Sequence, residues 1–402
     1  MNRARRLWLA VHRWLGLVLG LWFVLLGLTG SALVFYRGLD EWADPRLAAR
    51  PGVAASPPLE AVYQALRTAH PQRGMSWRIE LPREPGEPIT ARHLAPVESR
   101  GQRFAPLLSS VDPLTRQVVA DRFWGQTPGT WLYDLHYTLL LGEAGHQAVG
   151  WAGVALAASL VSGLWLWWPA AGGGAGRWRR AWQFKRQAAA PRRVYDLHKL
   201  AGLYGGLLLL VLALTGAALA LPDLARPLIA RFSPLTPMPQ LRMPVAAEAS
   251  RLTGPMDVDA AVARAEQAWP DARARWVDTP AAPGAPYRVR LRQPGEPGDR
   301  FPDTLVWIDS RSGQVLARRD PAGFSAGDCV WRWMHPLHSG EAFGLPGRLL
   351  VCACGVLPLL LAVTGGLRWW HKRRARQGRP TTVAARAPAA RAAPVSGAGP
   401  AP

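Results

Sequence analysis

Apolar runs long enough to cross a membrane dominate the hydrophobic pattern of this sequence. They lie at residues 7–36, 149–168, 200–221 and 349–370. Each is about as long as the 20-residue helix that a hydrocarbon core requires. The first run follows the basic stretch MNRARR, as a secretory signal would, but it is longer than a signal's apolar region and no small-x-small cleavage site follows. The pattern therefore predicts four transmembrane helices, the first a retained anchor.

The two long segments between these runs are patterned like small soluble domains. In the second, "MDVDAAVARAEQAWP" has helical spacing and ends at a proline, "YRVRLR" alternates as a strand, and "DTLVWIDSRSGQVLARRD" predicts a hairpin. The first segment repeats this order more weakly, with "PLEAVYQALRTAHP" as the helix and "LLSSVDPLTRQVVADR" as the hairpin. We expect each segment to form an α+β module, and the whole chain to be a mainly α membrane protein.

An internal repeat explains why the same order of elements occurs twice. A His-x3-Gly-x3-Gly pattern and a Thr-Gly dipeptide recur at equal spacing, as His12, Gly16, Gly20 and Thr29-Gly30, and as His198, Gly202, Gly206 and Thr215-Gly216. Farther along, "GEAG" from Gly142 matches "GEAFG" from Gly340. We infer a tandem duplication.

The distribution of positive charge predicts the orientation in the membrane. The chain has a formal net charge of +21. The N-terminus carries four arginines and no acid, residues 170–199 carry eight bases against Asp196, and the stretch from Arg368 carries eight bases and no acid. The positive-inside rule places these three segments in the cytoplasm. Because this basicity is a topology signal, it also argues against nucleic acid as a partner.

The expected layout alternates membrane helices with two outer modules. Cytoplasmic segments are the N-terminus, a basic loop and a tail rich in Ala, Pro and Arg that we expect to be disordered. The predicted parts are 1–36 (N-terminus and first helix), 37–146 (first module), 147–169 (second helix), 170–199 (basic loop), 200–221 (third helix), 222–344 (second module), 345–370 (fourth helix) and 371–402 (tail).

Histidines at the membrane boundary are the candidate chemical groups. On a helix that turns about 100° per residue, Gly16 lies about 40° from His12, and Gly202 stands in the same relation to His198. A histidine beside a glycine-lined groove can reach a flat macrocycle, and two facing helices can supply both axial ligands of a haem. The alternative is that the glycines form a small-xxx-small helix contact and the histidines sit among lipid headgroups.

A second pair of histidines follows the modules. His136 in "YDLHYTLLLGEAG" corresponds to His335 in "WRWMHPLHSGEAFG", and His338 competes with His335 because the register slips by one residue. We therefore expect haem iron between His12 and His198 and between His136 and His335, which makes one or two b-type haems. Pairing of His12 with a ligand on the second or fourth helix remains an alternative.

The motifs "HRWLGLVLGLWFVLLGLTGSALVF", "LHYTLLLGEAG" and "SGLWLWWP", with their second copies, resemble the PepSY-associated transmembrane family of bacterial iron-regulated inner-membrane proteins. The resemblance extends to about Lys372. It implies four helices carrying two periplasmic PepSY-like modules in the bacterial inner membrane. For characterised relatives it further implies b-type haem and reduction of ferric siderophores on the periplasmic side.

These observations lead to one main hypothesis and two alternatives. The main one is a multi-pass haem protein that passes electrons from quinol or a partner protein to a ferric siderophore or another ferric chelate; we see no nucleotide-binding motif, since "AGGGAG" lacks the GxGxxG spacing. Whether the protein is an enzyme stays open, because a non-catalytic PepSY membrane protein that binds a peptide or envelope partner would show the same modules. A transporter would also contain repeats, but no charged residue lies near mid-membrane.

Overall fold

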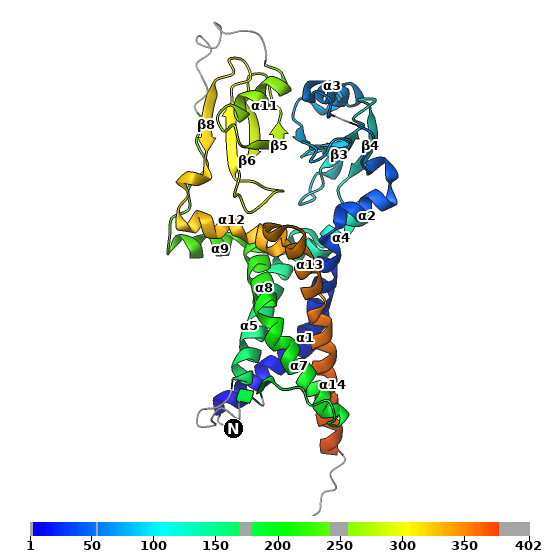
Figure 1. Ribbon diagram of the computed structural model, residues 1–402, viewed down its shortest axis with the longest axis vertical. Helices are drawn as coiled ribbons and strands as arrows, with labels where there is room; N and C mark the ends of the chain where they lie inside the picture. Colours follow the sequence, from blue (N-terminus) through cyan, green and yellow to red (C-terminus); the bar gives the residue numbers. More distant parts are fainter. Residues whose placement is uncertain (1–2, 54, 169–177, 180, 242–255, 378–402) are drawn as a thin grey trace, which may run out of the picture.

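The computed structural model describes residues 3–53, 55–168, 178–179, 181–241 and 256–377. It consists of a helical bundle with two modules at one end (Figure 1). Both the start of helix α1 and the end of helix α14 lie at the opposite end of the bundle, which we call the terminal side. The stretch "AGGGAG" and the tail beyond Gln377 fall outside the described residues.

The bundle contains helices α1 (Arg3–Leu33), α5 (Gly142–Trp167), α7 (Ala190–Tyr204), α8 (Gly206–Ala220), α13 (Gly344–Cys354) and α14 (Leu357–Gln377). Three stretches are long and apolar enough to cross a membrane: α1, α5, and Glu341–Gln377, which includes α13 and α14. Helices α7 and α8 together make a fourth if they count as one span, although the chain bends by 57° between them. The described residues thus provide three or four spans.

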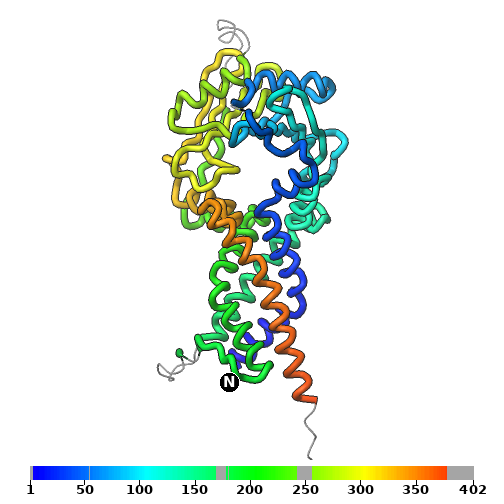
Figure 2. The backbone as a smooth tube through the Cα atoms, turned by 45° about the vertical axis from the view of Figure 1, so that its right-hand side comes forward, coloured from blue at the N-terminus to red at the C-terminus, as the bar shows by residue number. Residues whose placement is uncertain are grey.

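Helix α1 packs on α5 and α14, and α7 packs on the same two helices. Helices α1 and α7 therefore lie diagonally across the bundle, and Figure 2 shows α1 and α14 next to each other in the middle of the bundle. Gly205, between α7 and α8, has no room for a side chain because Leu357 fills the space beside it. The bent helix pair therefore packs closely on α14 at this point.

Several short helices form a layer between the bundle and the modules (Figure 1). They are α2 (Tyr36–Ala43), α4 (Pro128–Thr138), α9 (Pro222–Ala230) and α12 (Ala326–Ser339). Single 3-10 turns occur elsewhere in the described chain, at Pro45–Leu47, Pro71–Arg73, Val97–Ser99, Pro321–Gly323 and Glu341–Phe343. The sequence pattern did not predict this layer. It matters for function because α4 carries His136 and α12 carries both His335 and His338.

The two modules share one antiparallel sheet of eight strands, in the order β4-β3-β2-β1-β5-β6-β7-β8. Strand β1 pairs with β5 across the module boundary, with Ile79 opposite Val277. The strands are β1 (Arg78–Glu80), β2 (Ile89–His93), β3 (Leu107–Val111), β4 (Val118–Phe123), β5 (Arg273–Asp278), β6 (Tyr287–Arg292), β7 (Thr304–Ile308) and β8 (Val315–Arg319). The strand order is symmetric about the β1–β5 pair, as a duplicated chain would give.

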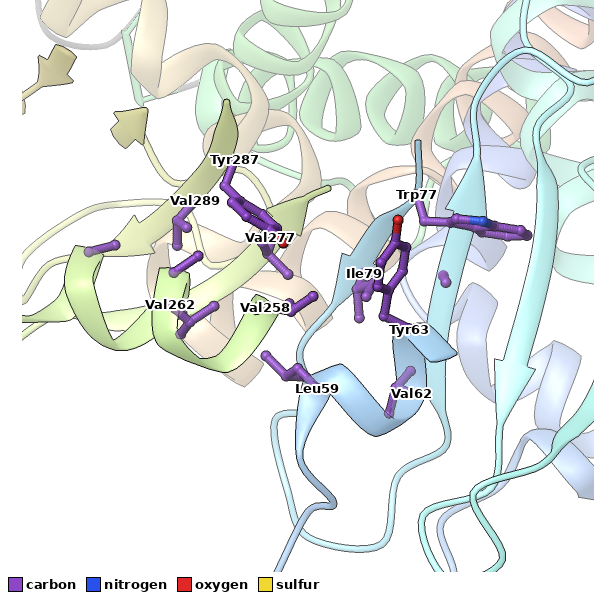
Figure 3. Close-up of a cluster of buried hydrophobic side chains, with 14 of the residues drawn as sticks. Leu59, Val62, Tyr63, Trp77, Ile79, Val258, Val262, Val277, Tyr287 and Val289 are labelled. Carbon is purple, nitrogen blue, oxygen red and sulfur yellow. The ribbon is translucent and has the colours of Figure 1, made fainter. Parts of the chain in front are cut away.

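Helices α3 (Leu59–Ala69) and α11 (Val258–Glu266) cover this sheet and join its core. Figure 3 shows Leu59 and Val258 at the point where the two helices begin next to each other. Asp259 accepts hydrogen bonds from the backbone N–H groups of Leu59 and Glu60, and Glu60 accepts one from Val258. Each helix thus receives a capping carboxylate from the other, which stabilises two otherwise opposed positive helix ends.

The predicted helices and hairpins of both modules are present. The residues at helical spacing in α11 are those it buries, and the hairpin strands β3–β4 and β7–β8 pair as expected. The union of the two modules into one sheet was not expected. It couples them through backbone hydrogen bonds as well as side-chain packing.

Candidate functional site: two histidine pairs

Two pairs of histidines face each other inside the bundle. His12 of α1 and His198 of α7 form the terminal-side pair, with ring centroids 6.1 Å apart and planes at 75°. His136 of α4 and His338 of α12 form the module-side pair, with centroids 6.2 Å apart and planes at 44°. The repeat predicted that His12 and His198 would lie at the same depth, and the structure brings their rings together.

A neighbouring helix holds each ring of the terminal-side pair through its Nδ1 atom. His12 Nδ1 lies 3.0 Å from the carbonyl oxygen of Ser159 and 3.1 Å from Oγ of Ser162, both on α5. His198 Nδ1 lies 3.1 Å from the carbonyl oxygen of Leu361 and 3.0 Å from Oγ1 of Thr364, both on α14. The two histidines are therefore supported in the same way from opposite sides of the bundle.

The module-side pair is supported by the same kind of contact. His136 Nδ1 lies 2.9 Å from Oγ1 of Thr29 on α1. His338 Nδ1 lies 3.2 Å from Oγ1 of Thr215 and 3.1 Å from the carbonyl oxygen of Leu212, both on α8. Thus the Thr-Gly dipeptides of the sequence repeat do not line the groove of His12 and His198 but hold the other two histidines.

These contacts fix the tautomer of the rings. A carbonyl oxygen can only accept, so the Nδ1 atoms of His12, His198 and His338 must carry the proton. For His136 the same follows from Thr29, whose hydroxyl already donates to the carbonyl oxygen of Leu25 at 2.7 Å. Among the described residues, none bonds to Nε2 of these four rings. Each ring therefore has a free Nε2 lone pair, the arrangement in which histidine binds a metal.

A glycine next to each supporting hydroxyl gives the imidazole its space. A Cβ at Gly163 would lie 3.0 Å from Cε1 of His12, and one at Gly365 would lie 3.3 Å from Cε1 of His198. At the module side, a Cβ at Gly30 would lie 3.1 Å from His136 and one at Gly216 would lie 2.7 Å from His338.

The hydroxyl-glycine dipeptide therefore occurs four times with one role. The internal repeat marked Thr29-Gly30 and Thr215-Gly216 but not Ser162-Gly163 and Thr364-Gly365. The signal was available, since the same two-residue pattern recurs in the second and fourth apolar runs. It was not evident which histidine each dipeptide would support.

The spacing within each pair suits a metal ion held between two imidazoles. Two metal–nitrogen bonds of about 2.0–2.1 Å and the ring radii place the centroids roughly 6.3 Å apart. The observed separations are 6.1 and 6.2 Å. No cluster of three or more His, Cys, Asp or Glu side chains suited to a metal occurs in the described part of the chain. Two imidazoles leave a coordination sphere incomplete, so a metal here would need other ligands, such as those of a macrocycle.

The glycines proposed to line the terminal-side groove differ in their surroundings. A Cβ at Gly16 would have no atom within 4 Å, whereas one at Gly202 would lie 3.7 Å from a methyl group of Leu361. The space beside Gly16 is open next to His12, as a flat group bound to that histidine would require. Gly202 lies against the side chain of Leu361, the residue whose carbonyl oxygen supports His198.

The pairing of His136 with His335 is corrected by the structure, because His338 occupies that place. His335 instead lies 3.0 Å from Oε1 of Glu341 through its Nδ1, and its ring meets Phe301 edge to face at 4.9 Å. His335 and His338 both lie on α12, and the packing of that helix on α8 turns His338 toward Thr215. The pairing of His12 with a ligand on the second or fourth helix is likewise not what the structure shows.

The module-side histidines are neutral at ordinary pH. Burial lowers the pKa of His136 to about 4. Burial lowers that of His338 to about 3, helped by the neighbouring His136 and His335. A neutral imidazole is the form that binds a metal.

The two pairs lie at opposite ends of the bundle. His12 and Thr29, the support of His136, are seventeen residues apart on α1. At about 1.5 Å per residue this corresponds to about 26 Å, close to the hydrocarbon thickness of about 30 Å. The separation of the two pairs along the bundle is therefore comparable to the thickness of a hydrocarbon core.

Comparison with known proteins identifies the family of the chain. No curated protein matches this sequence. The family model for the PepSY-associated TM region matches residues 9–372, which include both histidine pairs, both modules and most of each membrane-spanning helix that the structure describes. The chain therefore belongs to the PepSY-associated transmembrane family and is a multi-pass membrane protein.

Proposed function

We propose that the protein is a haem-binding electron carrier of the bacterial inner membrane that reduces ferric siderophores or other ferric chelates in the periplasm. The observation that carries this proposal is the two histidine pairs, each with free Nε2 atoms and centroids 6.1 or 6.2 Å apart. The same support at all four rings argues against coincidence, since isolated histidines among lipid headgroups would need no such fixed geometry.

The residues present fit two b-type haems with two histidine ligands each. His12 and His198 would bind one, and His136 and His338 the other. Haem would supply reversible one-electron chemistry at its iron. The chain itself fixes the tautomer of each ligand, holds the rings through the backbone and hydroxyl contacts, and keeps the module-side rings partly buried. An imidazole held in its bound orientation loses less freedom on binding, which favours tight ligation.

The direction of electron flow follows from the charge distribution. If the basic segments are cytoplasmic, the terminal-side pair is near the cytoplasmic surface and the module-side pair near the periplasm. Quinol or a partner protein would deliver electrons to the protein, and the chelate would accept them beside the modules. Reduction would release the iron, because hard oxygen donors hold Fe(III) more firmly than Fe(II).

The test is spectroscopic and then kinetic. Purified protein should be red, with a Soret band that shifts on reduction, and should carry close to two haems per chain. Dithionite-reduced protein, freed of excess reductant, is then mixed anaerobically with hydroxamate, catecholate and citrate-type ferric chelates in the presence of a ferrous trap. We expect reoxidation of the haem together with formation of the trapped Fe(II) complex. Colourless, folded protein would refute haem binding, and haem that stays reduced with every chelate would refute the reductase assignment.

A further inference from the structure

Arg300 lies in the loop between β6 and β7, where the second module meets the layer of short helices. Its guanidinium is stacked against three aromatic rings, with centroid distances of 4.8 Å to Tyr36, 5.6 Å to Tyr133 and 5.2 Å to Phe301. The backbone on either side is also fixed: the N–H of Arg300 points to Oε2 of Glu341 at 3.4 Å, and its carbonyl accepts a bond from the indole of Trp276 at 3.0 Å. The side chain is thus held in place.

The guanidinium of Arg300 has no acceptor. Within the described residues it takes part in no hydrogen bond or ion pair, and its buried Nε atom has no partner. A guanidinium carries five N–H donors and keeps its charge under all ordinary conditions. Burying the Nε–H of this group without an anion or acceptor is costly. An unpaired but fixed arginine is therefore a candidate binding group.

The first half of the chain has an arginine at the equivalent position, and the side chain of that arginine is paired. Arg103-Phe104 lies nine residues before Asp112, and Arg300-Phe301 lies nine residues before Asp309. Arg103 bonds to the hydroxyl of Tyr137 at 3.1 Å and forms an ion pair with Glu143.

The corresponding acid in the second half is Glu341, within the repeated Gly-Glu-Ala motif. Its carboxylate lies 3.0 Å from Nδ1 of His335 and accepts a hydrogen bond from the backbone N–H of Arg300. The side chain of Arg300 is consequently left without the partner that Arg103 has.

The charge around Arg300 is positive. Arg37 and Arg92 both form ion pairs with the carboxylate of Glu80. The distance from Arg92 to this carboxylate is 3.3 Å, and only 7% of the surface of Arg92 is exposed. Although burial alone would raise the pKa of Glu80, Arg37, Arg92 and Arg300 keep it below its ordinary value. Three guanidinium groups therefore act on one ionised carboxylate, and the neighbourhood attracts a further anion.

We propose that Arg300 binds an anionic oxygen group of a ligand at the module side of the bundle, and that this ligand is a negatively charged ferric chelate with carboxylate donors. The identity of the ligand rests on the proposed function. Tyr133, against which Arg300 stacks, lies one helical turn before His136 on α4. A carboxylate on Arg300 would thus place the chelate beside the module-side pair, and two parallel N–H···O bonds from the planar guanidinium would orient it.

The direct test measures binding without electron transfer, using gallium(III) citrate, which has the charge and shape of the ferric complex but is not reduced. Titration calorimetry would compare the wild-type holoprotein with Arg300→Gln and with the matched control Arg103→Gln. We expect Arg300→Gln to weaken binding about tenfold or more, as loss of a charged hydrogen bond should, and Arg103→Gln to change it less than about twofold. Arg300→Lys should also lose several-fold affinity, because an ammonium cannot form the two-pronged contact.

A second kind of carboxylate could bind Arg300, namely a propionate of a haem at the module-side pair. If Arg300→Gln lowers haem content or shifts the haem potential while gallium citrate binds as before, the anion on Arg300 is a propionate. Unchanged gallium citrate affinity and unchanged haem in both Arg300 variants would overturn the inference. Arg300-dependent binding by a protein that reduces no chelate would leave the inference standing and refute the proposed reductase instead.

Discussion

The carbonyl oxygen of Leu361 lies 3.1 Å from Nδ1 of His198, and this contact decides which nitrogen of the ring remains available. Because the carbonyl cannot donate, Nδ1 holds the proton and Nε2 keeps its lone pair. On the other side of the pair, Ser159 imposes the same state on His12 through a carbonyl contact of 3.0 Å. Both rings thus present an unprotonated Nε2, which the proposed haem site requires.

The terminal-side pair should act as one unit. We expect His12→Ala and His198→Ala each to remove the same haem, so that haem content falls from about two per chain to about one in either variant and in the double variant, because losing either axial ligand breaks the site. The haem-to-protein ratio of purified protein measures this. His371→Ala, at the same end of the bundle, serves as the control. Full haem content in both variants, with normal folding, would return these histidines to a role at the lipid surface.

We expect the two histidines of α12, His335 and His338, to differ in their effect on haem content. His338→Ala and His136→Ala should each remove the module-side haem and abolish reduction of added ferric chelate, while the spectrum of the other haem persists. His335→Ala should retain both haems, because His335 contacts Glu341 rather than the opposite ring. Parallel measurement of haem content and ferrous-trap formation distinguishes the three variants. Loss of haem in His335→Ala with full haem in His338→Ala would contradict the observed pairing.

The hydroxyl of Thr29 should tune haem binding at the module side. Thr29→Val keeps the size of the side chain but removes the oxygen that His136 contacts at 2.9 Å. Loss of a partner that orients a metal ligand typically lowers affinity by about 10–100-fold, so we expect faster haem loss to a haem-scavenging apoprotein. Thr29→Ser restores the oxygen and is the matched control. Equal rates for the Val and Ser variants would show that the hydroxyl has no orienting role.

Gly216 should not tolerate even one methyl group. A Cβ there would lie 2.7 Å from Cε1 of His338, so Gly216→Ala should displace the imidazole and weaken haem binding at the module side. Gly206→Ala, on the same helix, is the control because no atom lies within 4 Å of its added Cβ. Absorbance spectra at matched protein concentration report the result. Similar haem content in both variants would mean that the ring can shift without cost.

The orientation of the chain has its own test. Reporter fusions within residues 37–146 and within residues 181–199 should report opposite compartments, with the first outside, because the basic segments are expected to remain in the cytoplasm. A fusion after Gln377 should give the cytoplasmic result. A cytoplasmic signal from the first module would reverse the bundle and place the modules away from any periplasmic chelate.

Much of the architecture was set by local sequence patterns. Apolar length marked the membrane helices, and the spacing of Val258, Ala261 and Val262 marked α11, because these patterns depend only on the period of a helix and the cost of exposing apolar groups. The repeat of His12 and Gly16 at His198 and Gly202 also marked two candidate ligands at one depth. Such signals are local, or repeat a local signal, and can be recognised before the chain is folded.

Only the tertiary structure decided which residues meet. Strand β1 has just three residues, Arg78–Glu80, too few to show alternation, so its pairing with β5 and the union of the modules depend on long-range contacts. His335 and His338 lie on the same short helix, and only the packing of α12 on α8 turned His338 to its partner. A one-dimensional pattern gives the face of a helix, but the neighbour opposite that face is set by how helices far apart in the chain pack together.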